Sequence, residues 1–406
     1  MVIKTNNKLL ALYTIALVTL CSGHAFQTLF PGAVKGFLFP FVLLTVLWEL
    51  LTRHSGTVDR LQLTVLLFGV MIACTTVAGL GSGLNFYITQ MCYIITAYGI
   101  TRLYSFQQTI NCYLTIMTTV AVIALIGYAL VQNTGVLESL PAMSNINDVE
   151  YRVGGIFNYI PMVPDRNCGM FWEPGLFATH LTLSIVFELL FREKSSLLRL
   201  VLFSVCIFTA NSSAGFVLWF LCVMLLIAKR IALTKNVLGW LFGVVIIGLG
   251  IAAIFWFDSL ITQTALAKNQ YFQKLTADSL SDASRVKAIG HNVDLFLSAP
   301  LFGVGVVGAS ASMEHVADTS TSTYLLSLFG VMGSLYTFGW GYGILKKVRA
   351  SLIIRVLLLI IVLVTVNKEP HHQMLFSWCL MFFLIKGDLS RISQRAAERS
   401  RIESLR

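Results

Sequence analysis

The 406-residue chain has few charged side chains. They make up 12% of the chain, whereas soluble domains carry about 25%. Hydrophobic residues reach 56%, and the mean hydropathy is +0.78. A water-soluble fold of this size has too little interior to hide so much apolar surface. The composition therefore excludes an ordinary soluble enzyme and predicts a polytopic membrane protein.

Clustered cysteines and clustered acidic residues are also missing. The eight cysteines are scattered, mostly inside apolar runs, and no Cys-x-x-Cys pair occurs. This spacing argues against a structural zinc site or a disulfide framework. No group of acidic residues suited to Mg²⁺ stands out either. The sequence therefore predicts neither a metal nor a cofactor.

Apolar runs that approach the length of a membrane-spanning helix, about 20 residues, occur along the whole chain. We predict twelve transmembrane helices, the first of them an uncleaved helix rather than a signal peptide. The predicted spans are 9–28, 33–51, 61–79, 84–101, 108–131, 169–191, 197–210, 213–228, 237–257, 323–345, 351–366 and 373–386. The chain then divides into helices 1–5 (1–131), a loop (132–168), helices 6–9 (169–257), a large loop (258–322), helices 10–12 (323–386) and a basic tail (387–406).

The basic residues are distributed unevenly over the two sides of these spans. Most of the 29 Lys and Arg residues fall on one side, as cytoplasmic loops require. We therefore place both termini in the cytoplasm and both long loops outside. The net charge of +10 is a topology signal and gives no reason to expect nucleic acid as a partner. The cations left on the outer side are Lys35, Arg152, Arg166, Lys268, Lys274, Arg285, Lys287 and Lys368.

The segment Arg166–Gly175 leads from the first long loop into the sixth predicted span. Arg166 and Glu173 are seven residues apart, so in a helix they would share a face. A carboxylate at an apolar boundary is costly, which makes Glu173 a candidate site residue. Pro174 and Gly175 would open or kink the helix and free backbone groups to line a cavity. The alternative is that Glu173 only pairs with an arginine and holds the loop down.

The second long loop contains two external cations, Arg285 and Lys287. External loops usually have few basic residues, and an anionic ligand is one reason to retain them. A diphosphate would suit the fork of a guanidinium group. The alternative is a solvated pair near Asp278 and Asp282.

A Gly-x-Gly-x-x-Gly pattern occurs at Gly303, Gly305 and Gly308. A dinucleotide site needs a strand before this pattern and a βαβ unit around it. Here the pattern lies in an external loop between predicted spans, so we expect a tight turn. External histidines could act as bases near neutral pH, although for each of them taken alone ordinary packing is the favoured explanation. They are His291, His315, His371 and His372.

Taken in order, these segments resemble the Wzy-type O-antigen and capsule polysaccharide polymerases and the related O-antigen ligases. The resemblance covers about residues 150–345 and includes the large external loop late in the chain. The segments that carry it are Arg166–Gly175, Asn211–Gly215, Ser284–Arg285, Pro300–Gly305 and Thr321–Leu335.

The resemblance implies an all-α, GT-C-like membrane protein of the bacterial inner membrane with its active site facing the periplasm. It implies a metal-independent, inverting glycosyltransferase. The donor is a glycan on undecaprenyl diphosphate, and the acceptor is a hydroxyl of a second lipid-linked repeat unit. Membrane lipids and a chain-length regulator are the further partners that it implies.

Within that mechanism, Glu173 is the predicted general base or orients the acceptor. Arg166 and Arg285 would stabilise the charge that develops on the leaving diphosphate. Secondary candidates for diphosphate binding are Arg152 and Lys287. Reserve candidates for the base are His291, His315 and Asp318.

Two other functions remain as alternatives. In the ligases the last motif tends to carry a His-Asn pair before the helix, where this chain has Asp318–Thr323, so we favour the polymerase. A transporter or flippase would carry polar residues in the middle of the membrane, but the predicted spans are nearly free of charge. The chain also lacks the two similar halves of a twelve-span transporter. These features favour chemistry at the outer surface.

Overall fold

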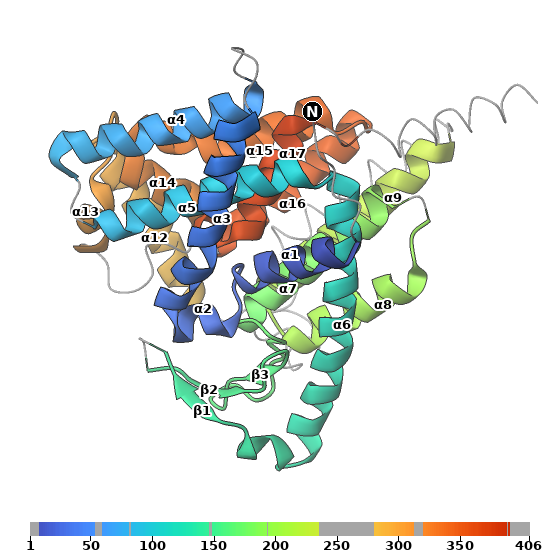
Figure 1. The fold of residues 1–406 in the computed structure, drawn as a ribbon. Helices are drawn as coiled ribbons and strands as arrows, with labels where there is room; N and C mark the ends of the chain where they lie inside the picture. Colours follow the sequence, from blue (N-terminus) through green and yellow to red (C-terminus); the bar gives the residue numbers. More distant parts are fainter. Residues whose placement is uncertain are drawn as a thin grey trace, which may run out of the picture.

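The computed structural model describes residues 8–52, 59–80, 83–145, 148–192, 194–234, 280–311, 320–387 and 389. Within these residues the fold is mainly helical, with one small sheet (Figure 1). The first helices are α1 (Lys8–Leu20), α2 (Ala25–Leu29), α3 (Pro31–Thr52), α4 (Arg60–Thr75), the π-helical η1 (Thr76–Leu80), α5 (Leu84–Leu103) and α6 (Phe106–Asn133). After the sheet come α7 (Pro174–Leu190), α8 (Leu197–Ala210) and α9 (Ser213–Thr234). The last elements are α12 (Leu280–Ser298), α13 (Gly305–Ala311), α14 (Thr321–Phe329), η4 (Gly330–Gly333), α15 (Ser334–Lys347), α16 (Leu352–Lys368), η5 (His371–Gln373) and α17 (Leu375–Lys386).

Three helices in the described part of the chain are long and apolar enough to cross a membrane. They are Arg60–Ala78, Phe106–Asn133 and Ser213–Ile231. Large apolar side chains such as Leu44, Leu66 and Ile126 are more than half exposed, as contact with hydrocarbon allows. The prediction of a mainly helical protein is confirmed, and these helices are compatible with a membrane location. The number of twelve spans stays a prediction, and its ninth span, 237–257, lies outside the described residues.

Two predicted spans are interrupted. The span predicted at 9–28 breaks after α1, and the span predicted at 323–345 breaks at Gly330. Non-helical backbone in apolar surroundings needs hydrogen-bond partners, and distant segments supply them. The backbone N–H of Leu375 donates to Cys21 O at 3.1 Å, and that of Trp172 donates to Gly23 O at 3.0 Å. These partners are remote in the sequence, so hydropathy could not reveal the breaks.

The predicted turn at the glycine-rich segment is confirmed. Gly303 has φ +72°, and α13 begins at Gly305 directly after the turn. The backbone N–H of Val331 donates to Pro300 O at 2.7 Å, which joins this turn to the break between α14 and α15. Gly330 has φ +61°, and a β-carbon there would lie 2.5 Å from the backbone of Leu301. The two glycine-containing turns therefore pack backbone to backbone.

The first long loop contains the sheet, so the prediction of an all-α fold is wrong in this part. After η2 (Val136–Ser139), the strands β1 (Ala142–Ser144), β2 (Glu150–Val153) and β3 (Asn158–Tyr159) pair antiparallel in the order β1-β2-β3. Ala142 faces Arg152, and Arg152 also faces Tyr159. Figure 1 shows the sheet at the end of the molecule that α6 reaches with its last turns. Strands of two to four residues are too short to show a hydropathy period.

The centre of the fold is formed by α7 and α17. Every residue from Pro174 to Leu189 is buried, as is every residue from Leu375 to Ile385. A helix that is apolar all round belongs inside a bundle. The surrounding helices are α4, α5, α6, α8, α9 and α15, each of which packs against α7 or α17. The start of α7 meets the end of α16 at Gly175, where Lys368 and Glu369 lie beside it.

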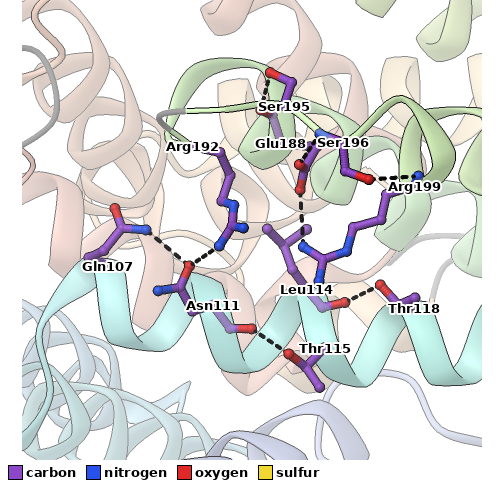
Figure 2. A network of polar contacts seen from close by, with 10 residues as sticks. All are labelled: Gln107, Asn111, Leu114, Thr115, Thr118, Glu188, Arg192, Ser195, Ser196 and Arg199. Atoms are coloured by element: carbon purple, nitrogen blue, oxygen red, sulfur yellow. Dashed lines mark hydrogen bonds and ion pairs between the residues drawn. The ribbon is translucent and has the colours of Figure 1, made fainter. Parts of the chain in front are cut away.

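The opposite end of α7 carries a separate polar network (Figure 2). The side chain of Glu188 is fully buried and accepts hydrogen bonds from Ser196 N at 2.6 Å and Arg199 Nη1 at 3.4 Å. Arg192 donates to Asn111 Oδ1 of α6 at 2.8 Å. A buried carboxylate needs such donors. The network therefore fixes the turn between α7 and α8 against α6.

Candidate functional site

The segment Arg166–Gly175 is not helical until Pro174. Glu173 is the N-cap residue of α7 in an extended conformation, and Pro174 occupies the first turn, where its missing N–H costs nothing. Because the stretch is not helical, Arg166 and Glu173 do not share a helix face, and Pro174 opens the helix. The carboxylate of Glu173 instead lies at the positive end of the α7 dipole, which favours its charged form.

Asn167 holds the non-helical part of this segment in place. Its side-chain amide donates to Ala124 O of α6 at 3.3 Å and to Thr209 Oγ1 of α8 at 3.1 Å. Its Oδ1 accepts from Gly169 N at 3.0 Å. Asn167 is almost completely buried, so these bonds replace lost water contacts. The approach to Glu173 is thereby fixed to two helices.

Three charged side chains meet at Gly175. A β-carbon on Gly175 would collide with Nζ of Lys368 and would lie 3.0 Å from Oε1 of Glu369 and 3.4 Å from Oε1 of Glu173. Lys368 and Glu369 form an ion pair at 3.5 Å and are 7% and 3% exposed. A side chain at this position would require the ammonium group to move. We name Glu173, Lys368 and Glu369 the charged cluster.

The turn between α8 and α9 joins the charged cluster to Arg166. Ser212 Oγ accepts a hydrogen bond from Lys368 Nζ at 2.9 Å. Two residues earlier, Ala210 O accepts from Nε of Arg166 at 3.5 Å. Asn211 between them has φ +46°, a left-handed conformation that asparagine tolerates. Arg166 and Lys368 therefore contact the same short turn.

The N-terminus of α14 contacts the charged cluster from another side. Thr321 Oγ1 donates to the backbone oxygen of Glu369 at 3.0 Å. Ser322 N donates to Oδ1 of Asn367 at 2.9 Å. The last segment of the predicted motif set therefore holds the end of α16, and with it Lys368.

Tyr151 of β2, in the first long loop, contacts the segment that leads to Glu173. Its hydroxyl donates to Trp172 O at 2.9 Å. Burial raises the pKa of Tyr151 to about 12, and the neighbouring carboxylate of Glu173 adds to this effect. The strand β2 is thus tied to the residue before Glu173.

The predicted histidine pair lies just beyond the cluster, in η5. His371 is buried and shares a 2.5 Å hydrogen bond with Ser377 through Nδ1. Burial holds the pKa of His371 well below its ordinary value, and nearby His180, His372 and Lys368 lower it further. In the described part of the chain, no three His, Cys, Asp or Glu side chains gather as metal ligands would.

The other predicted site residues fall elsewhere or outside the described part. Arg152 pairs with Glu150 at 3.1 Å and donates to Glu138 O and Leu140 O, which anchors β2 to η2. Lys287 is exposed on α12, and His291 is half-buried on the same helix. Arg285 belongs to α12, but its side chain lies outside the described residues, as do His315 and Asp318 entirely.

Sequence reasoning missed Lys368, Glu369 and Ser212 as site residues. Lys368 was counted only as one of the outer cations, because it follows a strongly apolar helix. The signal that could have found it is a cation and an anion adjacent at the outer end of such a helix. Ser212 lies 156 residues from Lys368 in the sequence, so only the fold pairs them.

Comparison of the chain with protein-family models and with curated proteins finds no match. The function therefore has to be argued from the chemistry of the charged cluster and from the order of the motifs.

Proposed function

We propose that the protein is a membrane glycosyltransferase that polymerises lipid-linked oligosaccharide repeat units at the outer face of the bacterial inner membrane. The observation that carries this proposal is the convergence of separate motifs. Segments Arg166–Gly175, Asn211–Gly215 and Thr321–Leu335 all contact the short stretch of chain at Lys368–Glu369. Ionisable residues gathered inside an apolar protein are candidates for a functional site by default, and this supports the proposal.

The proposed reaction transfers the growing glycan from undecaprenyl diphosphate to an incoming lipid-linked repeat unit. A hydroxyl of the acceptor sugar attacks the anomeric carbon of the donor, and a new glycosidic C–O bond forms. The bond between that carbon and the diphosphate oxygen breaks, and the diphosphate leaves with the electron pair. The proton of the acceptor hydroxyl passes to a base of the protein. No oxidant, reductant or nucleotide is consumed.

The site contains one residue that can accept the transferred proton and another that can stabilise the charge that develops on the diphosphate. Glu173, half-buried at the start of α7, is the proposed base. Arg166, half-buried at the α8–α9 turn, is the proposed partner of the diphosphate, because a guanidinium fork matches phosphate oxygens. Fixed cations stabilise a developing anion most strongly where water is excluded.

A deletion strain tests this function directly. We expect its lipopolysaccharide to carry only single repeat units on lipid A–core, instead of a ladder of many units. Bare core with accumulated lipid-linked polymer would identify the protein as a ligase. A normal ladder would show that the proposal is wrong.

Single variants then test the assignment of residues. Glu173→Gln and Arg166→Ala should each leave single-unit caps when expressed in the deletion strain at normal protein levels. Arg230→Gln, on the cytoplasmic side in our topology, is the matched control and should restore the full ladder. Complete restoration by both site variants would exclude this site.

A further inference from the structure

Lys368 is the most constrained cation in the candidate site. Its ammonium donates to Ser212 Oγ at 2.9 Å and pairs with Glu369 at 3.5 Å. Its side chain is 7% exposed, and Gly175 leaves the space that the ammonium occupies. An ammonium group that these contacts fix inside the protein cannot move with a diphosphate that enters and leaves the site. Its fixed position suits an effect on the two carboxylates beside it.

The two carboxylates beside Lys368 differ in access. Glu369 is 3% exposed, and Thr321 holds its backbone oxygen. Glu173 is half-buried at the beginning of α7, with Oε1 buried beside Gly175. Of the two, Glu173 is therefore the carboxylate that an acceptor sugar can reach. Glu369 is the inner partner of Lys368 in the ion pair.

We infer that Lys368 is the positioning residue of the site: its anchored ammonium lies beside the Glu173 carboxylate at Gly175 and favours the charged form, which accepts the substrate's proton. The effect of Lys368 on Glu173 rests on their common position at Gly175, whereas the use of Glu173 as a base rests on the proposed function. An opposite charge within about 4–6 Å moves the titration of a carboxyl group down by about one to three pH units.

Other described groups also face the cluster. From β2 comes Tyr151, which stays neutral because burial raises its pKa to about 12. From η5 comes His371, which stays neutral because burial lowers its pKa. Arg166 is directed to the α8–α9 turn, and α14 contributes only hydroxyl groups. Glu369 is the one carboxylate that opposes the effect of Lys368 among these described neighbours.

Carboxyl labelling of the full-length protein in lipid vesicles tests the inference without any substrate. Dicyclohexylcarbodiimide reacts with protonated carboxyl groups in apolar surroundings, and mass spectrometry distinguishes the Glu173 peptide from the Glu369 peptide. Labelling of Glu173 should fall as the pH rises through its titration. In Lys368→Met we expect the midpoint to move up by about one to three pH units. An unchanged midpoint would overturn the inference.

Matched variants separate charge from structure. Lys368→Arg keeps the charge and should keep the midpoint close to that of the natural protein. Lys194→Met removes an exposed cation at the other end of α7 and should leave the midpoint where it is. Ser212→Ala keeps the ammonium but removes its anchor, and serves if Lys368→Met does not accumulate. Its midpoint should move in the same direction, and no movement would contradict the inference.

The pH dependence of the glycan-transfer rate tests whether the effect of Lys368 on Glu173 matters for the proposed reaction. Below both midpoints, Lys368→Met should lose about tenfold in rate for every pH unit that separates its midpoint from that of the natural protein. The rate should recover at alkaline pH, with little change in KM. A loss that is equal at every pH would show a merely structural role. If no lipid-linked saccharide is polymerised by the natural protein, the proposed function fails, while the labelling midpoint still decides the role of Lys368 toward Glu173.

Discussion

The absence of a side chain at Gly175 is the feature on which the charged cluster depends. In Gly175→Ala, the new methyl group would collide with Nζ of Lys368 and would approach Oε1 of Glu369 to 3.0 Å. Overpacking of this kind costs about 1–3 kcal/mol. Alanine in place of glycine in a helix returns at most about 1 kcal/mol. We expect a net loss of stability together with displacement of the ammonium from Ser212.

A double-mutant cycle identifies the cause of this loss. Lys368→Met has no Nζ, so in that background the added methyl group no longer meets the ammonium. The cost of Gly175→Ala should then fall toward zero, which gives a coupling energy of about 1–2 kcal/mol. The assay is equilibrium unfolding in detergent, followed by tryptophan fluorescence. Gly341→Ala on α15 is the control, because a β-carbon there meets nothing within 4 Å. An equal cost of Gly175→Ala in both backgrounds would refute the reasoning.

Three further predictions concern the rest of the fold. Burial holds the pKa of His371 below its ordinary value, so the stability that it contributes is complete above about pH 6.5 and is lost as the pH falls below that value. His371→Asn should therefore flatten the fall of the unfolding midpoint between about pH 6.5 and 5; an unchanged slope would contradict this. Glu188→Ala leaves buried donors unpaired and should cost about 1–3 kcal/mol without changing transfer per folded molecule, whereas exposed Lys194→Met should cost nothing measurable. Gly330→Ala places a β-carbon 2.5 Å from backbone at positive φ and should cost about 2–5 kcal/mol, visible as loss of protein from the membrane; normal accumulation would count against the packed turns.

Composition alone was enough to predict the helical class, because so apolar a chain cannot fold around a small interior. Most helix positions also followed from hydropathy. The break at Cys21–His24 did not, because its backbone is satisfied by Leu375, Trp172 and other residues that lie far away in the sequence. A hydropathy window averages local residues and contains no information on such partners.

The candidate site could be predicted only in part for the same reason. Glu173 and Arg166 were found because they stand out in a local motif. Lys368 was not, because its importance comes from Gly175 and Ser212, which reach it only through the packing of α7, α9 and α16. A lysine at the end of an apolar helix otherwise looks like a simple interfacial anchor.

Reconstituted transfer is the most direct measurement of the central claim. Purified protein in lipid vesicles is supplied with a single undecaprenyl-diphosphate-linked repeat unit, and the lipid products are separated by size. The account predicts lipid-linked products of two or more repeat units, with one undecaprenyl diphosphate released for each new linkage, and neither product with Glu173→Gln. Polymer formation that is unchanged in Glu173→Gln, or none with the natural protein, would contradict it.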